Sequence, residues 1–412
     1  MPNAIDSEST VSLVRIGILT LLFAIAITAA ARRAYIPESV ALVLAGLAAA
    51  AFRPDLRLGI TPGLVLAVLI PGLVFEAAYR LKWSVLRAEL GLISVLAIPG
   101  VAISAAIVAG VLSVTTGLPF ELAFVVGAMA AATDPIAVVA TFRRLGAPDR
   151  LATLVEGESL LNDGTGLVLF ALTVRTVGGL VDPASALASF VATILVSGAV
   201  GIVGGVVAGR LIALADDRAI EISLSIVVAY GAYLIADAFS LSGIIATVIA
   251  AIALRLQLKD EVDRETLEAL DTIWEYVAFA LTAVVFLVVG LTIRLPELLD
   301  AMGPVVWGAL AVIVGRALIV YVLVGGISRI RRAAGAAPLI PVAWLHVVFW
   351  AGLRGAIAVA AALSLPLEFP QRLLLQEITF GIVLLTLLVQ GTTAGLVVRT
   401  ALRANDVGPK LA

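Results

Sequence analysis

The feature that most constrains this chain is a succession of apolar stretches, most of them long enough to cross a lipid bilayer as a helix. A membrane-crossing helix needs roughly 20 apolar residues. We predict thirteen transmembrane helices, at 11–31, 37–52, 61–80, 87–113, 120–142, 152–177, 184–215, 220–238, 242–258, 272–293, 303–327, 341–365 and 373–399. Between the eighth and the ninth, Phe239-Ser240-Leu241 forms either a turn or a kink, and residues 258–271 read as a polar linker.

Composition supports an all-α polytopic membrane protein. Of the 412 residues, 62% are hydrophobic and 14% are charged, and the mean hydropathy is +1.14. These values exclude an ordinary soluble domain. Cysteine is absent, which rules out disulfides and thiol chemistry, and a single histidine, His346, excludes a histidine-rich metal site. We expect no enzymatic activity, cofactor, nucleic-acid partner or soluble regulatory domain.

The basic residues predict how the chain is oriented. Of the 27 Lys and Arg residues, 19 follow an odd-numbered stretch, 6 lie on the other side, and Arg316 and Arg354 lie inside stretches. Basic loops favour the cytoplasmic side of a membrane. We therefore predict a plasma-membrane protein with its amino terminus outside and its carboxyl terminus inside.

Acidic residues interrupt the apolar sequence between positions 127 and 170. A carboxylate inside a bilayer costs a few kcal/mol and is normally paired, hydrated or functional. The sequence therefore predicts an ion site in this region. The residues concerned are Asp134, Glu156, Glu158 and Asp163.

The fifth stretch contains Thr133-Asp134-Pro135 near its middle. Pro135 removes a backbone donor and interrupts the helix. Transporters place ion sites at such interruptions, but Asp is also a common cap at the start of a helix. Asp134 is therefore an ion-binding residue, a cap of the second half-helix, or both.

The sixth stretch carries Ser159, Asn162 and Asp163, whose spacing places them on one face of a helix. Hydroxyl and carboxylate oxygens suit a hard cation such as Na⁺, although the same residues could form a structural polar network. Glu158 lies about 140° away from Asp163 around the helix. A buried glutamate there needs a cation, which is either Arg316 or Arg354.

Two further charged residues lie inside apolar stretches. Arg354 is flanked by Gly352 and Gly355, so the twelfth stretch is also expected to break, with Arg354 compensating the exposed helix carbonyls. Glu76 is the one acidic residue of the third stretch. It either lines an ion path or pairs with a nearby basic residue.

These residues resemble the cation/proton antiporter family, in the electroneutral sodium/proton branch that includes prokaryotic antiporters and animal sodium/hydrogen exchangers. The resemblance covers nearly the whole chain. It rests on Phe75-Glu76, Thr133-Asp134-Pro135, Glu156-Gly157-Glu158-Ser159-Leu160-Leu161-Asn162-Asp163, Gly352-Leu353-Arg354-Gly355-Ala356 and Val389-Gln390-Gly391-Thr392.

The resemblance implies an inverted repeat in which the fifth and twelfth helices cross and are partly unwound. It implies a dimer domain within 11–80 and 220–293, a core domain within 87–177 and 303–399, a connecting helix at 184–215 and a short cytoplasmic tail at 400–412. The protein would be a homodimer in the lipid bilayer.

The resemblance also implies residue roles. Asp163 would bind either the cation or the proton, with Ser159, Thr133 and Asp134 completing the site. Asn162 would replace a second aspartate of electrogenic relatives, and Glu158 would pair with Arg316. The implied activity is electroneutral exchange of one Na⁺ or Li⁺ for one H⁺ by alternating access. K⁺/H⁺ exchange in the same family and an ion channel are the alternatives, and an intramembrane aspartyl protease is disfavoured by the order of residues in Asp163-Gly164-Thr165-Gly166.

Overall fold

The computed structural model describes residues 7–34, 36–52, 62–179, 182–215, 217–259, 261–335 and 338–406, and every secondary-structure element in these ranges is a helix. Seven continuous segments among them are long and apolar enough to cross a membrane: Trp83–Thr116, Asp149–Val177, Ser185–Ala213, Arg218–Ala238, Arg264–Thr292, Met302–Ala333 and Arg372–Arg403. Shorter apolar helices are Glu38–Phe52, Val65–Tyr79, Phe120–Met129 and Gly243–Leu258.

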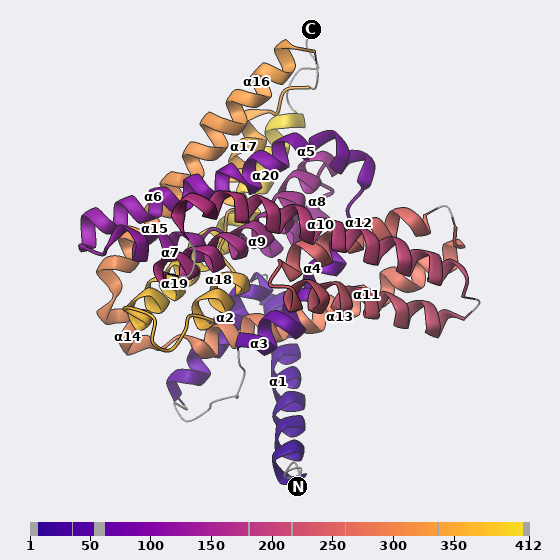
Figure 1. Cartoon of the computed structure of the whole chain (residues 1–412), viewed down its shortest axis with the longest axis horizontal. Helices are drawn as coiled ribbons and strands as arrows, with labels where there is room; N and C mark the ends of the chain where they lie inside the picture. Colours follow the sequence, from indigo (N-terminus) through magenta and orange to yellow (C-terminus); the bar gives the residue numbers. More distant parts are fainter. Residues whose placement is uncertain are drawn as a thin grey trace.

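The helices follow one another along the whole described chain (Figure 1). The first half forms α1 (Ser7–Ala34), α2 (Glu38–Phe52), α3 (Pro62–Leu64), η1 (Val65–Leu69), α4 (Ile70–Tyr79), α5 (Trp83–Ala97), α6 (Pro99–Thr116), α7 (Phe120–Met129), α8 (Ile136–Leu145), α9 (Asp149–Val177) and α10 (Pro183–Ala213). The second half forms α11 (Arg218–Ala238), α12 (Gly243–Leu258), α13 (Arg264–Thr292), α14 (Leu295–Asp300), α15 (Met302–Ala317), η2 (Leu318–Val324), α16 (Gly325–Ala333), α17 (Val342–Trp350), α18 (Ala356–Leu363), α19 (Arg372–Thr386), η3 (Leu387–Gly391) and α20 (Thr392–Asp406).

Each apolar stretch of the sequence coincides with one helix or with consecutive helical segments. The number of membrane crossings stays a prediction. Two details differ from or refine the expectation. Helix α13 already begins at Arg264, so the second half of the expected linker 258–271 is helical. Ser240, with φ 57°, turns the chain between α11 and α12, so these are two helices and not one kinked helix.

Some residues on which the predicted topology and domains depend lie outside the described residues. Arg53, Arg57 and Lys410, which enter the count of basic residues, lie there. So do residues 53–61 of the expected dimer domain and residues 407–412 of the expected tail.

Two of the helices are interrupted in the middle, as the sequence predicts. Residues 130–135 separate α7 from α8, and residues 351–355 separate α17 from α18. The two interruptions touch, because the backbone N–H of Asp134 donates a hydrogen bond of 2.7 Å to the carbonyl of Leu353. Two non-helical backbone segments therefore meet inside the bundle, where irregular backbone is tolerated only if protein or a cavity surrounds it.

The helices pack as two groups. In one group, α5 to α9 pack with α15 to α20, and this group contains both interrupted helices. In the other, α1 to α4 pack with α11 to α13. Helix α10 lies mainly on α12 and also contacts α9, so it touches both groups. Figure 1 shows α11, α12 and α13 extending to one side of the molecule and α14 and α15 lying at the other.

Glycines allow some of these helices to approach backbone to backbone. A Cβ atom at Gly201 or Gly205 of α10 would overlap backbone carbonyls of α12. The same is true of Gly46 in α2 against α13. Small residues commonly allow such close contact between membrane helices. The Gly-rich sequence 198–209 is thus a packing surface between α10 and α12.

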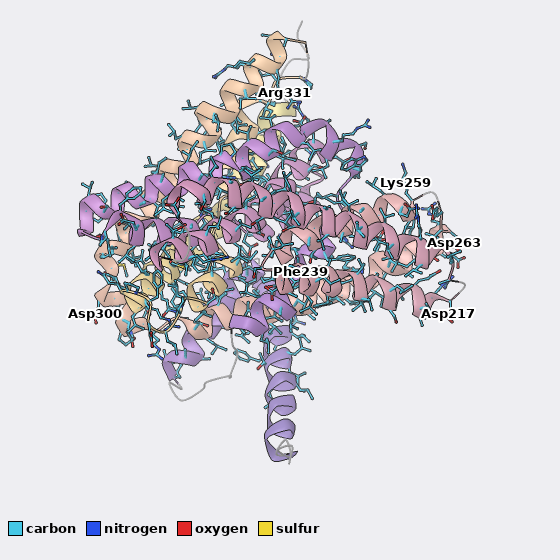
Figure 2. The ribbon with its side chains drawn as sticks, in the orientation of Figure 1. Asp217, Phe239, Lys259, Asp263, Asp300 and Arg331 are labelled. Carbon is cyan, nitrogen blue, oxygen red and sulfur yellow. The ribbon has the colours of Figure 1, made fainter. Side chains whose placement is uncertain are left out.

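Side-chain caps mark the starts of α11, α12 and α13 in the second group. Asp217 accepts hydrogen bonds from two N–H groups at the start of α11, and Ser242 and Asp263 cap α12 and α13. Such caps satisfy backbone donors that have no partner within the helix. Asp217 and Asp263 lie at the same end of the molecule, opposite Asp300 (Figure 2). Arg218 and Glu265, which follow these caps, form an ion pair there.

Candidate functional site

Asp134 caps both half-helices that follow the interruptions. Its Oδ1 accepts a hydrogen bond of 3.2 Å from the N–H of Ile136, the first residue of α8. The N–H of Ala356, the first residue of α18, donates to the same carboxylate. The amino-terminal end of a helix carries a partial positive charge. The Asp134 carboxylate therefore compensates two helix ends at once, which is the capping role that the sequence left open.

Two arginines compensate the carboxyl-terminal ends that precede the interruptions. Arg354 donates from Nη1 to the carbonyls of Ala131, at 2.6 Å, and Ala132, at 3.3 Å, just after α7. Arg316 donates from Nη2 to the carbonyl of Val348, at 2.8 Å, in the last turn of α17. Each cation lies where the helix dipole is negative. The four half-helix ends are thus neutralised by one carboxylate and two guanidinium groups.

Gly355 leaves the space that the Asp134 carboxylate occupies. A Cβ atom at Gly355 would overlap the side-chain atoms of Asp134. The backbone of Gly355 is extended, with φ −139° and ψ −151°, so the requirement is steric. In the sequence, Gly355 indicated only a weakened helix, because its contact with Asp134 depends on how two distant segments cross.

We expect Gly355→Ala to lower the stability of the protein by about 1–3 kcal/mol, because a methyl group must displace a buried carboxylate. The measurement is the melting temperature in detergent, together with the transport rate. Gly110→Ala is the matched control, since a Cβ there meets nothing within 4 Å. Equal melting temperatures for the two variants would contradict this explanation.

Asn162 connects the first interruption to α9. Its Nδ2 donates to Thr133 Oγ1 at 2.6 Å and to Glu158 Oε1 at 2.7 Å, and its Oδ1 accepts from the Thr133 N–H at 3.1 Å. Ser159 donates from Oγ to the Thr133 carbonyl at 2.6 Å. The predicted residues Thr133, Ser159 and Asn162 are thus in direct contact. Both polar atoms of the Asn162 amide are thus engaged, the oxygen by the Thr133 N–H and the nitrogen by the Thr133 hydroxyl and the Glu158 carboxylate.

Glu158 and Arg316 form a buried, bidentate ion pair. Arg316 Nη1 lies 2.8 Å from Glu158 Oε1, and Nη2 lies 2.8 Å from Oε2. The two side chains are 2% and 6% exposed, so both charges are almost completely removed from solvent. Of the two partners that the residues alone left open for Glu158, the structure pairs it with Arg316 and not with Arg354.

Asp163 faces a cavity of about 750 Å³ that also reaches Thr133, Asp134 and Ser159. The residue is only 8% exposed, yet its carboxylate has no hydrogen-bonding or ion-pairing partner within the described part of the chain. The predicted residues therefore separate into two sets. The first set lines the cavity and consists of Thr133, Asp134, Ser159 and Asp163. The second set lies outside the cavity lining and contacts the residues or the helix ends around it; its members are Asn162, Glu158, Arg316 and Arg354.

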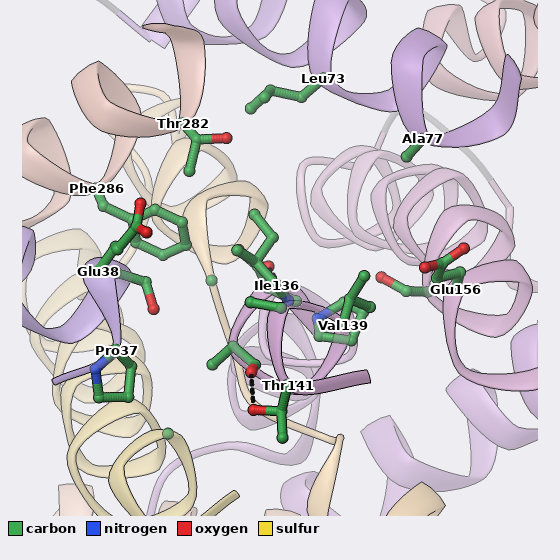
Figure 3. Close-up of a pocket in the computed structure, with 18 of the residues that line it drawn as sticks. Pro37, Glu38, Leu73, Ala77, Ile136, Val139, Thr141, Glu156, Thr282 and Phe286 are labelled. Carbon is green, nitrogen blue, oxygen red and sulfur yellow. Dashed lines mark hydrogen bonds between the residues drawn. The ribbon is translucent and has the colours of Figure 1, made fainter. Parts of the chain in front are cut away.

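The cavity lies between the two groups of helices. Figure 3 shows Glu156 near Ala77 of α4, with Thr282 and Phe286 of α13 and Glu38 of α2 across the cavity. The short helix α8 contributes Ile136, Val139 and Thr141 (Figure 3). Both groups of helices therefore line the cavity that contains Asp163.

Glu76, for which the sequence offered an ion path or a basic partner, has a basic partner in the structure, and the ion path stays a prediction. It lines the cavity, and its Oε1 pairs with Arg80 Nε at 2.9 Å. Arg143 Nη2 lies 4.0 Å from the same oxygen. Arg80 also contacts Glu275 of α13.

A second buried charge cluster, which the sequence pattern did not predict, surrounds Glu89. Glu89 of α5 is 3% exposed and accepts from Arg150 Nε at 2.7 Å and from Arg331 Nη1 at 3.1 Å. It ties together α5, α9 and α16, all in the group that holds the interrupted helices. In the sequence, Arg150 and Arg331 looked like ordinary loop charges, and only the fold shows that they share one carboxylate.

Comparison with known proteins shows the family to which the chain belongs. Residues 18–400 match the family described as "Sodium/hydrogen exchanger, transmembrane". The chain belongs to this family of membrane-embedded secondary transporters, which are not enzymes.

Several curated proteins are similar over most of the chain. The low-affinity Na⁺/H⁺ antiporter NhaS1 of Synechocystis sp. is 35% identical over 370 residues, covering 88% of this chain and 69% of that protein. The Na⁺/H⁺ antiporter ApNhaP of Aphanothece halophytica is 36% identical over 87% of this chain and 68% of its own length. The Na⁺/H⁺ antiporter NhaH of Halobacillus dabanensis is 32% identical over 91% of this chain and 94% of its own length.

A solved structure has the same fold. The sodium proton antiporter MjNhaP1 of Methanocaldococcus jannaschii at pH 8 superposes with a TM-score of 0.80 and 19% sequence identity, covering 96% of this chain and 99% of that one. At this level of identity the likeness concerns the fold alone. It agrees with the all-helical class that the sequence predicts.

Proposed function

We propose that this protein exchanges Na⁺ for H⁺ across a membrane, with Asp163 binding either the cation or the proton. The observation that carries the proposal is the Asp163 carboxylate itself. It is nearly buried, has no partner among the described residues and opens onto the cavity. A buried carboxylate without a partner is costly unless a cation or a proton neutralises it. In the proposed cycle, Na⁺ and H⁺ take turns neutralising the Asp163 carboxylate.

The neighbouring oxygens suit a sodium ion. The Ser159 hydroxyl and the Thr133 carbonyl are hydrogen-bonded to each other and line the same cavity as Asp163. Together they offer one charged and two neutral oxygens, the ligand type that hard cations prefer. In this proposal Asp163, Ser159 and Thr133 bind Na⁺. Asp134 does not bind the ion, because its carboxylate caps the two half-helices.

Alternating access would come from movement of the group that contains the interrupted helices. We assign α5 to α9 and α15 to α20 to a mobile core domain, α1 to α4 and α11 to α13 to a dimer domain, and α10 to the connection between them. The distribution of contacts and the position of the cavity between the groups support this division. We further propose a homodimer in the plasma membrane, with the amino terminus outside and the carboxyl terminus inside.

The test of the function is a flux assay on protein reconstituted into liposomes with an internal pH indicator. A pulse of Na⁺, Li⁺ or K⁺ is added on one side, and proton movement is followed. We expect saturable proton efflux or influx opposite to the Na⁺ or Li⁺ gradient. Exchange driven by K⁺ alone would reassign the protein as a K⁺/H⁺ antiporter. Unsaturable cation flux without counter-movement of protons would indicate a channel.

Exchange is expected to be electroneutral, with one Na⁺ moving against one H⁺. Asn162 is an amide with both polar atoms engaged, and the charge of Glu158 is matched by Arg316. Asp163 then remains the one carboxylate of the site free to alternate between cation and proton. Clamping the membrane potential with K⁺ and valinomycin should leave the exchange rate nearly unchanged. A steep dependence on potential would contradict 1:1 exchange and would point to Asp134 as a second titrating group.

A further inference from the structure

The cavity contains a charged side chain to which the exchange reaction assigns no role. Arg143 lies in the last turn of α8, two residues before its end, and its side chain is 55% exposed. It lines the cavity that leads to Asp163. A cation on the path of a transported cation repels it, so its presence there calls for an explanation.

Arg143 forms the one ion pair that joins the two groups of helices in the described part of the chain. The other ion pairs between helices connect residues of the same group, for example Glu89 with Arg150 and Arg331 in one group and Arg255 with Asp271 in the other. Two more, Lys82–Asp149 and Arg294–Glu297, involve the residue that directly precedes α5 or α14. Arg143 of α8 instead reaches Glu76 of α4 across the cavity, at 4.0 Å. This is the longest separation among the ion pairs of the described residues, and the Arg143 side chain has no hydrogen bond to any of those residues.

Glu156 provides a second carboxylate on the same cavity. It extends from α9 next to Ala77 of α4 (Figure 3) and has no ion pair among the described residues. Arg143 lies within electrostatic range of it. Arg143 therefore stands near two carboxylates, and it is held tightly by neither.

We propose that Arg143 is a tethered cation that competes with the transported cation for Glu76 and Glu156 in the access cavity. This inference rests on the proposed exchange function. An incoming Na⁺ has to displace the guanidinium group before these carboxylates attract it toward Asp163. Because Arg143 is exposed and its Nη2 lies 4.0 Å from Glu76 Oε1, displacing the guanidinium group requires little free energy. Arg143 then sets the KM for Na⁺ and not the maximal rate.

The first test compares three variants in the same liposome assay. Arg143→Gln should lower the KM for Na⁺ by about two- to fivefold at an unchanged maximal rate, the range expected for an exposed ion pair. Arg143→Lys should keep a KM close to that of the unmodified protein, because it keeps the charge. Arg144→Gln is the matched control. It removes the same charge from the same turn and cavity wall, but Arg144 forms no ion pair with the described residues, so the KM for Na⁺ should fall much less than in Arg143→Gln.

The second test shows whether Arg143 acts through Glu76. Glu76→Gln alone should raise the KM for Na⁺. In that background, Arg143→Gln should produce a smaller decrease in the KM, because one of the two contested carboxylates is gone. A purely structural role of Arg143 would not generate this dependence.

Several outcomes would overturn the proposal. They are an unchanged KM in Arg143→Gln, an equal decrease in Arg144→Gln, and a decrease that persists undiminished in the Glu76→Gln background. A change in maximal rate at constant KM would instead make the Arg143–Glu76 contact a latch between the groups. Absence of Na⁺-driven proton flux in the unmodified protein would refute the exchange function itself, so the two failures are distinguishable.

Discussion

Asp163→Asn is expected to abolish Na⁺-driven proton flux while leaving the protein folded. The asparagine amide has the shape of the carboxylate but carries neither the negative charge that binds Na⁺ nor a titratable proton. Asp163 has no hydrogen bond or ion pair to lose among the described residues, so the substitution should not destabilise the fold. The measurements are flux in proteoliposomes at saturating Na⁺ and the melting temperature in detergent.

Asp300→Asn is a suitable control for this variant. Asp300 ends the short helix α14 far from the cavity, and its substitution makes the same chemical change at an exposed position. It should retain full exchange. Retained proton flux in Asp163→Asn would remove Asp163 from the centre of the mechanism. Loss of flux accompanied by a large fall in melting temperature would mean that the carboxylate has a structural role that the structure does not reveal.

The interruptions of the two crossing helices were predictable because their causes are local. Pro135 cannot donate a backbone hydrogen bond, and Gly352 and Gly355 weaken the twelfth predicted helix wherever it lies in the fold. The grouping of Ser159 with Asn162 was predictable for a similar reason. Residues three apart on a helix share a face in every fold.

The contacts between the interrupted helices were not predictable in the same way. Asp134 lies against Gly355, and Arg354 donates to Ala131, across more than two hundred positions of sequence. The spacing of apolar and polar residues along the chain does not indicate which two segments cross in the fold. The sequence did limit the ion-pair partner of Glu158 to two arginines, because a buried carboxylate needs a cation and the apolar stretches contain few basic residues. Choosing between them required the fold, which brings the Arg316 side chain of α15 to Glu158 of α9 and to the Val348 carbonyl of α17.

Removing one member of the Glu158–Arg316 pair should destabilise the protein strongly. Deleting one partner of a buried ion pair typically costs about 3–5 kcal/mol, because the other charge remains buried without compensation. Arg316→Leu also takes a donor from the Val348 carbonyl, whereas Glu158→Gln keeps an acceptor for Asn162. We therefore expect a lower melting temperature in detergent for both variants, with Arg316→Leu the more severe.

The double variant Glu158→Gln/Arg316→Leu should be more stable than the sum of the single losses predicts. Neither residue then carries an uncompensated charge, so part of the penalty disappears. The exposed pair Arg264–Glu268, whose side chains are 91% and 65% exposed, supplies the control. Arg264→Gln should change stability by less than about 1 kcal/mol. Strictly additive losses at Glu158 and Arg316 would show that the two side chains are not energetically coupled, despite their two contacts of 2.8 Å.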